Sequence, residues 1–325
     1  MLQEKIFNIK SEKEFNTLAL EVFNFQFENN KVYRSFCDLL YIHPSDVKMA
    51  EDIPFLPIGF FKTHNVVSSV QKPVISFSSS GTTGSVTSKH HVTDLSIYEE
   101  SYLSGFKQFY DAIEDYVVLA LLPSYLEREG SSLIYMVDDL IKKSKHPESG
   151  FYLNNLDEIN EKLIALDQSG KKVLLIGVSF ALLDLIEQYQ FQLKNTIVME
   201  TGGMKGRRKE IIRPELHQLL KDGFGVSEIH SEYGMTELLS QAYSKGNGIF
   251  ECPPWMKVFT RDTEDPLSIQ KANKTGGINV IDLANINSCS FIATQDLGKL
   301  YNDDSFEILG RFDHSDIRGC NLMAL

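Results

Sequence analysis

The sequence predicts an α/β protein, with a largely parallel sheet flanked by helices and a smaller, β-rich C-terminal subdomain. Two patterns carry this prediction. From about residue 71, near-continuous apolar runs of strand length alternate with helical stretches, as in parallel sheets whose strands are joined by helices. From GGINVIDL (276–283) onward no long helix is expected between the strands, which is typical of antiparallel pairing. The 325 residues, 42% of them hydrophobic, suffice for a sizeable core.

The first 70 residues predict a helical segment packed on this core. Ser11 suits the N-cap of an amphipathic helix whose apolar side includes Phe15, Leu18 and Phe23. Apolar runs then indicate the strands KPVISFS (72–78), DYVVLALLP (115–123), KKVLLIGV (171–178), NTIVMETGG (195–203) and GVSEIHSEYG (225–234).

Helices are expected between these strands. One opens at Thr93 or Asp94, and another, SFALLDLIEQYQ, has Ser179 as its N-cap. A basic helix, RRKEIIRPELHQLLK (207–221), is expected to break or kink near Pro214, because proline removes a backbone donor.

Composition and charge narrow the function classes. With 44 acidic and 32 basic residues the net charge is −12, which argues against duplex nucleic acid as a partner. The N-terminus, MLQEKIFNIKSEKEF, lacks the basic and apolar stretches of a signal peptide, and no apolar run reaches 18 residues. We therefore expect a cytoplasmic protein without a membrane span. The scattered cysteines indicate neither a disulfide framework nor a zinc site; they are Cys37, Cys252, Cys289 and Cys320.

Three loops rich in glycine, hydroxyl or charged residues follow expected strands, at residues 78–88, 200–208 and 230–237. In open α/β sheets, ligands bind at the carboxyl ends of the strands. We therefore expect the three loops to contribute to one site.

The first loop, SSSGTTG, combines the hydroxyls of Ser80, Thr82 and Thr83 with the glycines Gly81 and Gly84. Glycines permit tight turns, and hydroxyls beside exposed amides can cradle a phosphate. The loop is not a Walker A motif, because GxxxxGK[ST] cannot be drawn through it. On the residues alone, a mobile Ser/Thr loop remains an equal alternative.

The other two loops also carry two interpretations each. In ETGGMKGRRKE (200–210), a basic cluster behind a Gly-Gly turn can meet a phosphate or a carboxylate, but a solvated helix face explains it as well. In SEYGMTELL (231–239), Tyr233 can stack on a base, Thr236 can donate to a phosphate and Glu237 can hold Mg²⁺. A helix capped by Thr236 explains the same residues.

Four blocks together resemble the signature motifs of the adenylate-forming superfamily of acyl-CoA synthetases and luciferases. They are SSSGTTG, EYGMTE, ATQDLG and GRFDHSDIRG, in that order, between Ser78 and Gly319. The resemblance implies an adenylate-forming core with ATP and Mg²⁺ as cofactors. A substrate carboxylate would attack the α-phosphorus of ATP, and the metal and the loop donors would stabilise the departing pyrophosphate.

The resemblance also implies a role for each matching residue. The loop from Ser80 to Gly84 would hold the β- and γ-phosphates, Thr236 would contact the α-phosphate and Glu237 would coordinate Mg²⁺. Adenine would lie between the Gly-Gly turn and the tyrosine ring, and the ribose hydroxyls would meet the aspartate, with the arginine near them. These nucleoside-binding residues would be Gly202, Gly203, Tyr233, Gly234, Asp296 and Arg311.

Two departures from the superfamily pattern matter. A lysine often stands closer behind the last glycine of the first loop, whereas here Lys89 stands five residues after Gly84, so its role is left open. Typical members also continue beyond GRxD into a small mobile domain that brings a lysine for adenylation. We expect this chain to lack that usual mobile C-terminal domain.

The acyl-protein synthetases of the bacterial luminescence fatty-acid reductase complex (the LuxE family) are similar in this respect. Their chains are short, carry FFK ahead of the glycine-rich loop, as in FLPIGFFKTHNV (55–66), and end soon after GR. Members of that family activate a fatty acid with ATP, transfer the acyl group to a cysteine near their own C-terminus and hand it to a reductase. Cys320 stands in that position, and Arg318 and His314 nearby would favour its thiolate.

We therefore interpret the sequence as an acyl-protein synthetase, a ligase that activates a carboxylic acid, by resemblance a fatty acid. We expect a helical segment (1–70), an ATP-binding adenylation core (71–308) and a C-terminal tail (309–325) that carries Cys320. The partner would be an acyl reductase or another acyl-accepting protein. Two alternatives stay open: an acyl- or aryl-CoA ligase of the phenylacetate-CoA ligase type, and a non-catalytic subunit that keeps the nucleotide fold.

Overall fold

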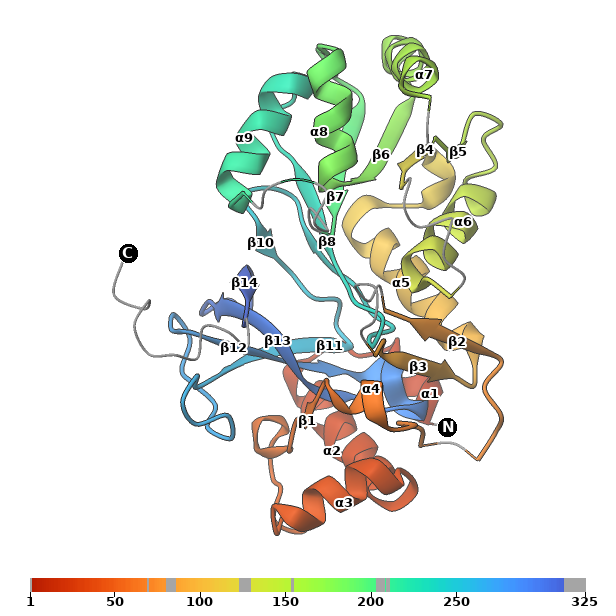
Figure 1. Ribbon diagram of the computed structural model, residues 1–325. Helices are drawn as coiled ribbons and strands as arrows, with labels where there is room; N and C mark the ends of the chain where they lie inside the picture. Colours follow the sequence, from red (N-terminus) through yellow and green to blue (C-terminus); the bar gives the residue numbers. More distant parts are fainter. Residues whose placement is uncertain are drawn as a thin grey trace.

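The fold is seen in a computed structural model, which describes residues 2–68, 70–79, 86–122, 130–152, 155–202, 208 and 211–312. These residues form two six-stranded sheets and a separate pair of strands, and helices pack around them (Figure 1). The architecture is therefore the α/β fold class that the sequence predicts.

The first sheet is the predicted parallel sheet. Its strands lie in the order β5–β4–β6–β7–β8–β9, and all neighbours are parallel except β8 and β9. Because helices cover both faces, β4 is buried along its whole length, as is β6 beyond its first residue. The bounds are β4 (Tyr116–Leu121), β5 (Gly150–Phe151), β6 (Lys172–Val178), β7 (Thr196–Thr201), β8 (His230–Tyr233) and β9 (Ala242–Ser244).

Helices flank this sheet on both sides. In Figure 1, α7, α8 and α9 lie in a row along one face, and α5 and α6 lie against the other. The predicted opening of α5 is confirmed, because the side chain of Asp94 accepts a hydrogen bond from the backbone N–H of Ser96 at 3.1 Å. The bounds are α5 (Leu95–Tyr110), η2 (Ile113–Asp115), α6 (Ser132–Ser144), α7 (Leu156–Gln168), α8 (Ser179–Gln188) and α9 (Arg213–Phe224).

Two predicted helix starts are wrong in detail. Ser179 does not cap α8: it is the first helical residue, and its hydroxyl donates 2.7 Å to the carbonyl of Gly202 at the end of β7. The basic helix begins later than predicted: residues 208, 211 and 212 are not helical, and α9 begins at Arg213 with Pro214 in its first turn. Of the break or kink expected near Pro214, the structure therefore has the break. A proline costs little in that first turn, since the first N–H groups of a helix have no partner within it.

The second sheet is mostly antiparallel, in the order β10–β14–β13–β12–β11, with β1 added parallel to β13. It begins earlier in the chain than predicted and its strands reach ten residues. The bounds are β1 (Leu56–Pro57), β10 (Ile249–Phe250), β11 (Met256–Arg261), β12 (Thr275–Asp282), η3 (Leu283–Asn287), β13 (Phe291–Leu300) and β14 (Phe306–Arg311). Strand β14 continues past residue 308, the expected end of the core.

The strand predicted at residues 72–78 forms, but outside the parallel sheet. It is β2 (Ile75–Ser78), paired antiparallel with β3 (Lys89–Val92) only. Of its four residues Phe77 alone is fully buried, so the strand does not have the two covered faces of a central parallel strand.

The N-terminal helices pack on the second sheet. Ser11 caps α2 as predicted, accepting from the N–H of Glu14 at 3.3 Å. The buried Gln26 amide donates to the carbonyls of Asn285 and Ile286 at 3.0 and 2.9 Å, which ties α2 to η3. The bounds are α1 (Leu2–Ile6), α2 (Glu12–Asn29), α3 (Lys31–Leu39), η1 (Ala50–Asp52) and α4 (Phe60–Thr63). Among the described helices, none is both long and apolar enough to cross a membrane.

Close packing of α9 on α8 predicts the effect of one substitution. A Cβ at Gly223 would lie 2.5 Å from the Cβ of Ile186, so Gly223→Ala forces the helices apart. We expect a loss of about 1–3 kcal/mol in the free energy of unfolding, although alanine favours a helix. Urea titration measures it, with Gly105→Ala in α5 as the control, because that Cβ meets only Trp255 at 3.9 Å. Equal stability of the two variants would contradict this packing.

Candidate active site

Three of the predicted site residues meet where the two sheets face each other. Tyr233, the last residue of β8, donates its hydroxyl hydrogen to Oδ2 of Asp296 in β13 at 2.8 Å. Asp296 pairs in register with Arg311 of β14, whose Nε lies 3.5 Å from Oδ1. Burial raises the pKa of Asp296, while the tyrosine hydroxyl and the arginine charge oppose that rise.

The ring of Tyr233 is held by packing. It is 9% exposed and makes edge contacts with Phe250 and Phe306, at centroid distances of 5.9 and 5.7 Å. These contacts set the direction of its hydroxyl. Gly234, the next residue in the chain, is exposed.

The segment with Thr236 and Glu237 is a turn, and the described residues there do not form the helix of the alternative interpretation. The carbonyl of Thr236 accepts from Nδ1 of His90 at 2.9 Å, and the carbonyl of Glu237 accepts from the amide of Asn285 at 2.7 Å. Burial lowers the pKa of His90 to about 4, so its ring is neutral and Nδ1 carries a proton toward the carbonyl.

Instead of a helix, the side chain of Asp282 provides the hydrogen-bond acceptor for the backbone N–H groups that follow the turn. Its carboxylate accepts from the N–H groups of Leu239 and Ser240 at 2.8 and 2.9 Å, and from the Ser240 hydroxyl at 2.6 Å. In a helix capped by Thr236, the threonine side chain would accept from the N–H of Leu239 and its carbonyl from the N–H of Ser240. The turn is therefore held by β12 and η3 and not by local capping.

The carboxyl group of Glu237 is buried in this turn. Burial raises its pKa, and a hydrogen bond from the Ser88 side chain opposes the rise. No cluster of three or more His, Cys, Asp or Glu able to hold a metal occurs among the described residues. A carboxylate such as that of Glu237 has the chemistry of a Mg²⁺ ligand, and Mg²⁺ commonly takes one or two carboxylates together with waters and phosphate oxygens.

Sequence reasoning missed a buried ionic cluster at the end of β7. Glu200 lies near Arg213 and His217 of α9, with 3.4 and 3.6 Å from its Oε1 to the nearest nitrogens, and Ser179 donates to its Oε2 at 3.3 Å. Burial works against ionisation, but the bond with His217 and the charge of Arg213 outweigh it and lower the pKa of Glu200. The acid beside the Gly-Gly turn was the available signal.

A second missed residue is Glu232 of β8, which pairs in register with Thr201 of the neighbouring strand β7. It accepts from the Thr201 hydroxyl at 2.5 Å, and burial raises its pKa to about 7. A Cβ on Gly234 would clash with Oε1 of Glu232, so this glycine leaves room for the acid. The acid that precedes Tyr233 in EYGMTE was the signal in the sequence.

Several predicted residues lie outside the described part of the chain. They are Ser80, Gly81, Thr82, Thr83, Gly84, Gly203 and Cys320. Gly202 is described: it is exposed at the end of β7 with a φ of 69°, a conformation that glycine adopts readily.

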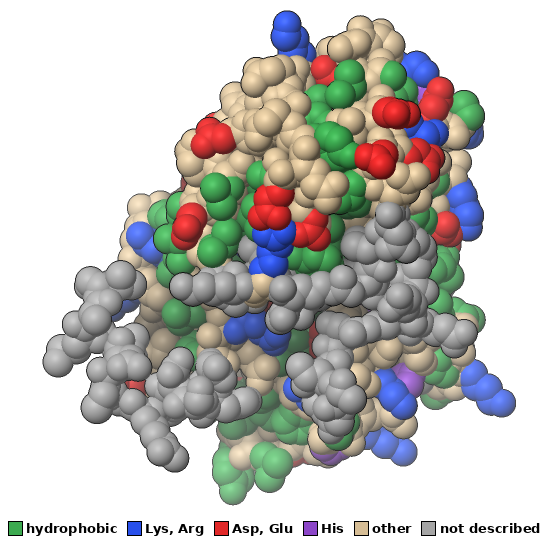
Figure 2. Space-filling model, turned by 45° about the horizontal axis from the view of Figure 1, so that its top comes forward, with side chains coloured by type: hydrophobic (Ala, Val, Ile, Leu, Met, Phe, Trp, Pro, Cys, Tyr) green, Lys and Arg blue, Asp and Glu red, His purple; other side chains and the backbone are tan. Residues whose placement is uncertain are grey.

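Arg208, from the predicted basic cluster, is engaged by carboxylates of α8. It forms ion pairs with Asp184 and with Glu187, the latter at 2.5 Å. Acidic and basic side chains lie next to one another on the face of the molecule seen in Figure 2. Arg208 therefore pairs with acids of a neighbouring helix, as a surface arginine can, but it does not lie on the helix face of the alternative interpretation, because α9 begins at Arg213.

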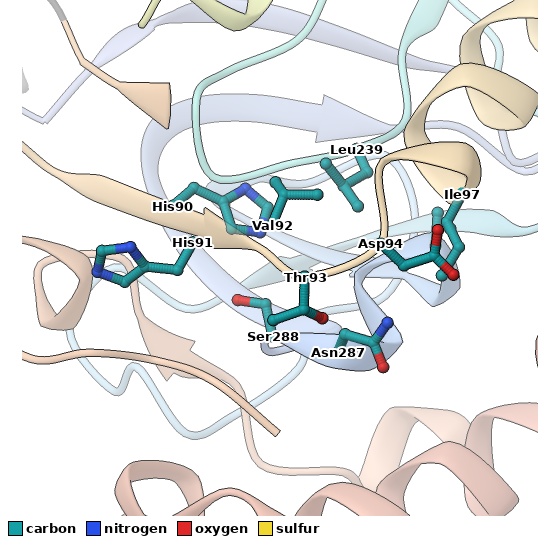
Figure 3. Close-up of a pocket in the computed structure, with 10 residues that line it drawn as sticks. His90, His91, Val92, Thr93, Asp94, Ile97, Leu239, Asn287 and Ser288 are labelled. Atoms are coloured by element: carbon teal, nitrogen blue, oxygen red, sulfur yellow. The ribbon is translucent and has the colours of Figure 1, made fainter. Parts of the chain in front are cut away.

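The histidines beside the turn have separate surroundings. Figure 3 shows His90 and His91 pointing in different directions from β3, above a pocket that Thr93 and Ser288 also line. This cavity measures about 10 Å³, room for about one water molecule and too little for a substrate.

The comparisons with known proteins identify the fold. No protein-family model matches the chain, and no curated protein matches its sequence. A structure of 2-hydroxyisobutyryl-CoA ligase in complex with 2-HIB-AMP, in the postadenylation state, is similar with a TM-score of 0.68 and 12% identity over 94% of this chain and 69% of that chain. An open conformation of the same ligase with 2-HIB-AMP and CoA gives 0.67 and 11% over 94% and 72%.

ATP-bound MatB from Rhodopseudomonas palustris is also similar, with a TM-score of 0.54 and 16% identity over 76% of this chain and 48% of that one. The chain thus spans about half the length of MatB. These likenesses show that the described residues have the core fold of adenylate-forming acyl-CoA ligases, as predicted.

The opposite pKa shifts of Glu232 and Glu200 predict a pH effect. Unfolded, Glu232 titrates near 4.5, and folded near 7, so the folded state holds an extra proton between these values. Stability therefore falls as pH rises through this window. Glu232→Gln removes this decline. In urea titrations, the free energy of unfolding of the variant should therefore rise relative to that of the wild type between pH 5 and 8.

Glu200→Gln is the matched control, because the pKa of Glu200 is lowered. Its ionised form stabilises the fold above about its unfolded value of 4.5, and that contribution is lost as pH falls. Its difference from the wild type should therefore be largest at neutral pH and shrink in acid. Parallel profiles for Glu232→Gln and wild type would show that Glu232 does not keep its proton.

Proposed function

We propose that this protein activates a carboxylic acid with ATP as an acyl-adenylate, transfers the acyl group to Cys320 and delivers it to a partner such as an acyl reductase. The observation that carries the proposal is the meeting of Tyr233, Asp296 and Arg311 beside the Glu237 turn, on a fold shared with a ligase that was crystallised with an acyl-AMP. The proposal places the protein with the acyl-protein synthetases, in the cytoplasm.

The nucleoside end of ATP would bind at the junction of the sheets. The Asp296 carboxylate, held by the Tyr233 hydroxyl, has the acceptor chemistry that two ribose hydroxyls require. Gly202, exposed after β7, and Gly234, exposed after β8, would leave backbone open to the adenine. Arg311 is 70% exposed and paired with Asp296, so it would remain within reach of the ribose.

The phosphate end would extend toward the Glu237 turn. The loop from Ser80 to Gly84 would cradle the β- and γ-phosphates, and Thr236 would contact the α-phosphate. When bound, Mg²⁺ would supply charge neutralisation at the phosphates, with Glu237 as its protein ligand. The carboxyl group must ionise for that role. A nearby cation favours ionisation of a buried acid, so metal and acid would support each other.

The chemistry then proceeds in two transfers. A substrate carboxylate oxygen attacks the α-phosphorus, the bond to the bridging oxygen breaks and pyrophosphate leaves. The Cys320 thiolate next attacks the acyl carbon, forming a carbon–sulfur bond, while the carbon–oxygen bond breaks and AMP leaves. The protein's own groups orient the nucleotide and hold the oxygens on which charge develops.

The other cysteines are poor acceptors. Burial raises the pKa of Cys37 to about 12, and it also raises those of Cys252 and Cys289 well above the ordinary range. A thiol that stays protonated is a weak nucleophile. This supports Cys320 as the acyl carrier. It would lie in the tail (309–325) of the proposed division, which follows a helical segment (1–70) and a core (71–308).

A second candidate is an acyl- or aryl-CoA ligase, in which free coenzyme A takes the acyl group. The similarity to 2-hydroxyisobutyryl-CoA ligase, one structure of which holds CoA, favours it. Both candidates share the adenylation step and differ in the acceptor.

Glu237→Gln tests the adenylation site. The substitution keeps size and hydrogen bonding but removes the charge that Mg²⁺ needs, so carboxylate-dependent pyrophosphate release should fall by at least about a hundredfold. Glu161→Gln, an exposed change on α7, is the control and should release pyrophosphate at the wild-type rate. If Glu237→Gln also keeps that rate, Glu237 serves only the turn.

Cys320→Ser tests the acyl acceptor. With ATP, Mg²⁺ and a panel of carboxylic acids, wild-type protein should gain the acyl mass as a hydroxylamine-sensitive thioester. Cys320→Ser should release pyrophosphate but gain no such mass, because a serine hydroxyl is far less ionised than a thiol. Intact-mass spectrometry reads both, with Cys252→Ser as a control that keeps acylation.

The same variant separates the two candidates. A coenzyme A ligase takes its acceptor from solution, so Cys320→Ser would turn over normally when coenzyme A is supplied. Wild-type protein that gains no acyl mass, while forming acyl-CoA, would replace the first candidate by the second.

A further inference from the structure

Strand β13 is irregular where it carries Asp296, the proposed acceptor of the ribose hydroxyls. The register of β12 and β13 shifts at this point, so that the three residues 294–296 stand opposite Ile278 alone. Such a bulge interrupts the ladder of backbone hydrogen bonds, and a buried carbonyl or N–H group without a partner is costly. The segment that carries Asp296 therefore needs hydrogen-bond partners from outside the ladder.

Arg261, the last residue of β11, provides such partners from across β12. It pairs in register with Gly277 of β12, and a Cβ on that glycine would lie 2.5 Å from Cζ of the guanidinium. Because β12 lies between β11 and β13, the missing side chain lets the arginine reach the third strand. The guanidinium donates to the carbonyl of Ile278 at 2.6 Å and to that of Thr294 at 2.5 Å.

The side chain of Thr294 continues the connection to Asp296. Its hydroxyl donates to the carbonyl of Ile278 at 2.9 Å and accepts from the backbone N–H of Asp296 at 3.1 Å. Arg261 thus bonds both strands of the bulge. Through Thr294 it also holds the backbone from which the Asp296 carboxylate meets the hydroxyl of Tyr233.

The positive charge of Arg261 acts on the same carboxylate. In the described contacts the hydrogen-bond partners of its guanidinium are neutral oxygens, the third being Oδ1 of Asn279 at 2.8 Å. The arginine is 9% exposed, so its charge is weakly screened by water. Burial raises the pKa of Asp296, and a hydroxyl and three cations oppose that rise: those of Tyr233, Arg311, Arg261 and Arg213.

We propose that Arg261 is a positioning residue of the nucleoside site, which holds the bulge of β13 so that the carboxylate of Asp296 faces the ribose hydroxyls. The inference rests on the proposed function and gives a role to a residue outside the sequence motifs. An ionised carboxylate offers about four acceptor positions, so Asp296 can accept from two ribose hydroxyls besides Tyr233 and Arg311. Arg261 would act on the nucleotide only through Asp296.

Calorimetric titration of the full chain with AMP and with 2′,3′-dideoxy-AMP tests the proposal, because the second ligand lacks the hydroxyls that Asp296 would accept. Arg261→Met should bind AMP about tenfold more weakly than the wild type does, and 2′,3′-dideoxy-AMP with unchanged affinity. Arg261→Lys keeps the charge but not the planar fork, so its affinity for AMP should lie between those of Arg261→Met and the wild type. Arg34→Met, which removes an exposed arginine of α3, is the matched control and should change neither affinity.

The outcomes separate the role of Arg261 from the function on which it rests. Equal weakening of both ligands in Arg261→Met would show that the arginine only supports the fold, and unchanged affinity for AMP would show that it is not needed. Either result overturns the inference alone. Wild-type protein that binds the two ligands equally well removes the ribose role of Asp296 and the inference with it.

Wild-type protein that binds neither ligand overturns the inference and the proposed function together. Thermal melting shows whether Arg261→Met is folded. If it is not, the same comparison of the two ligands is made with Arg261→Lys: a loss of affinity confined to AMP supports the inference, and any other result overturns it.

Discussion

The candidate site depends on the hydrogen bonds that the buried carboxylate of Asp282 accepts. It accepts from the N–H groups of Leu239 and Ser240 and from the Ser240 hydroxyl, and it thereby ties the segment after β8 to the end of β12. The same hydroxyl accepts from the indole of Trp255 at 3.1 Å. Each backbone donor left unpaired there would cost about 1–3 kcal/mol. The Glu237 turn is consequently held where the two sheets meet.

Two buried carboxyl groups on the adjacent parallel strands β7 and β8 differ in protonation state. Glu200 is kept ionised by Arg213 and His217, while Glu232, bonded only to a hydroxyl in the described contacts, keeps its proton up to about pH 7. The two side chains lie on opposite faces of the sheet, because Glu200 is in register with Ser231 and Glu232 with Thr201, but after burial the negative charge of Glu200 also helps to raise the pKa of Glu232. The arrangement lets the strand ends approach the candidate site without a double negative charge, which suits a site proposed to take a polyanion.

The sequence allowed the parallel strands to be predicted within a few residues, because β4, β6 and β7 are near-continuous apolar runs. The cap at Asp94 was also predictable, since it acts within two residues of itself. Predictions from local sequence were wrong where a residue distant in the chain takes the hydrogen bond that the local structure would have made. Ser179 bonds the carbonyl of Gly202 instead of capping α8, and the backbone after Thr236 turns toward His90 and Asp282 instead of forming a helix.

By itself, the sequence determined the alternation of strands and helices and placed Gly202, Tyr233 and Gly234 at strand ends, because apolar periodicity and local caps act over a few residues. Only the tertiary structure decided that Tyr233 meets Asp296, 63 residues away, and that Glu237 lies in a turn. It also decided which acids are buried and which are paired. Burial and long-range hydrogen bonds depend on how the sheets pack together, and no local pattern in the chain encodes that packing.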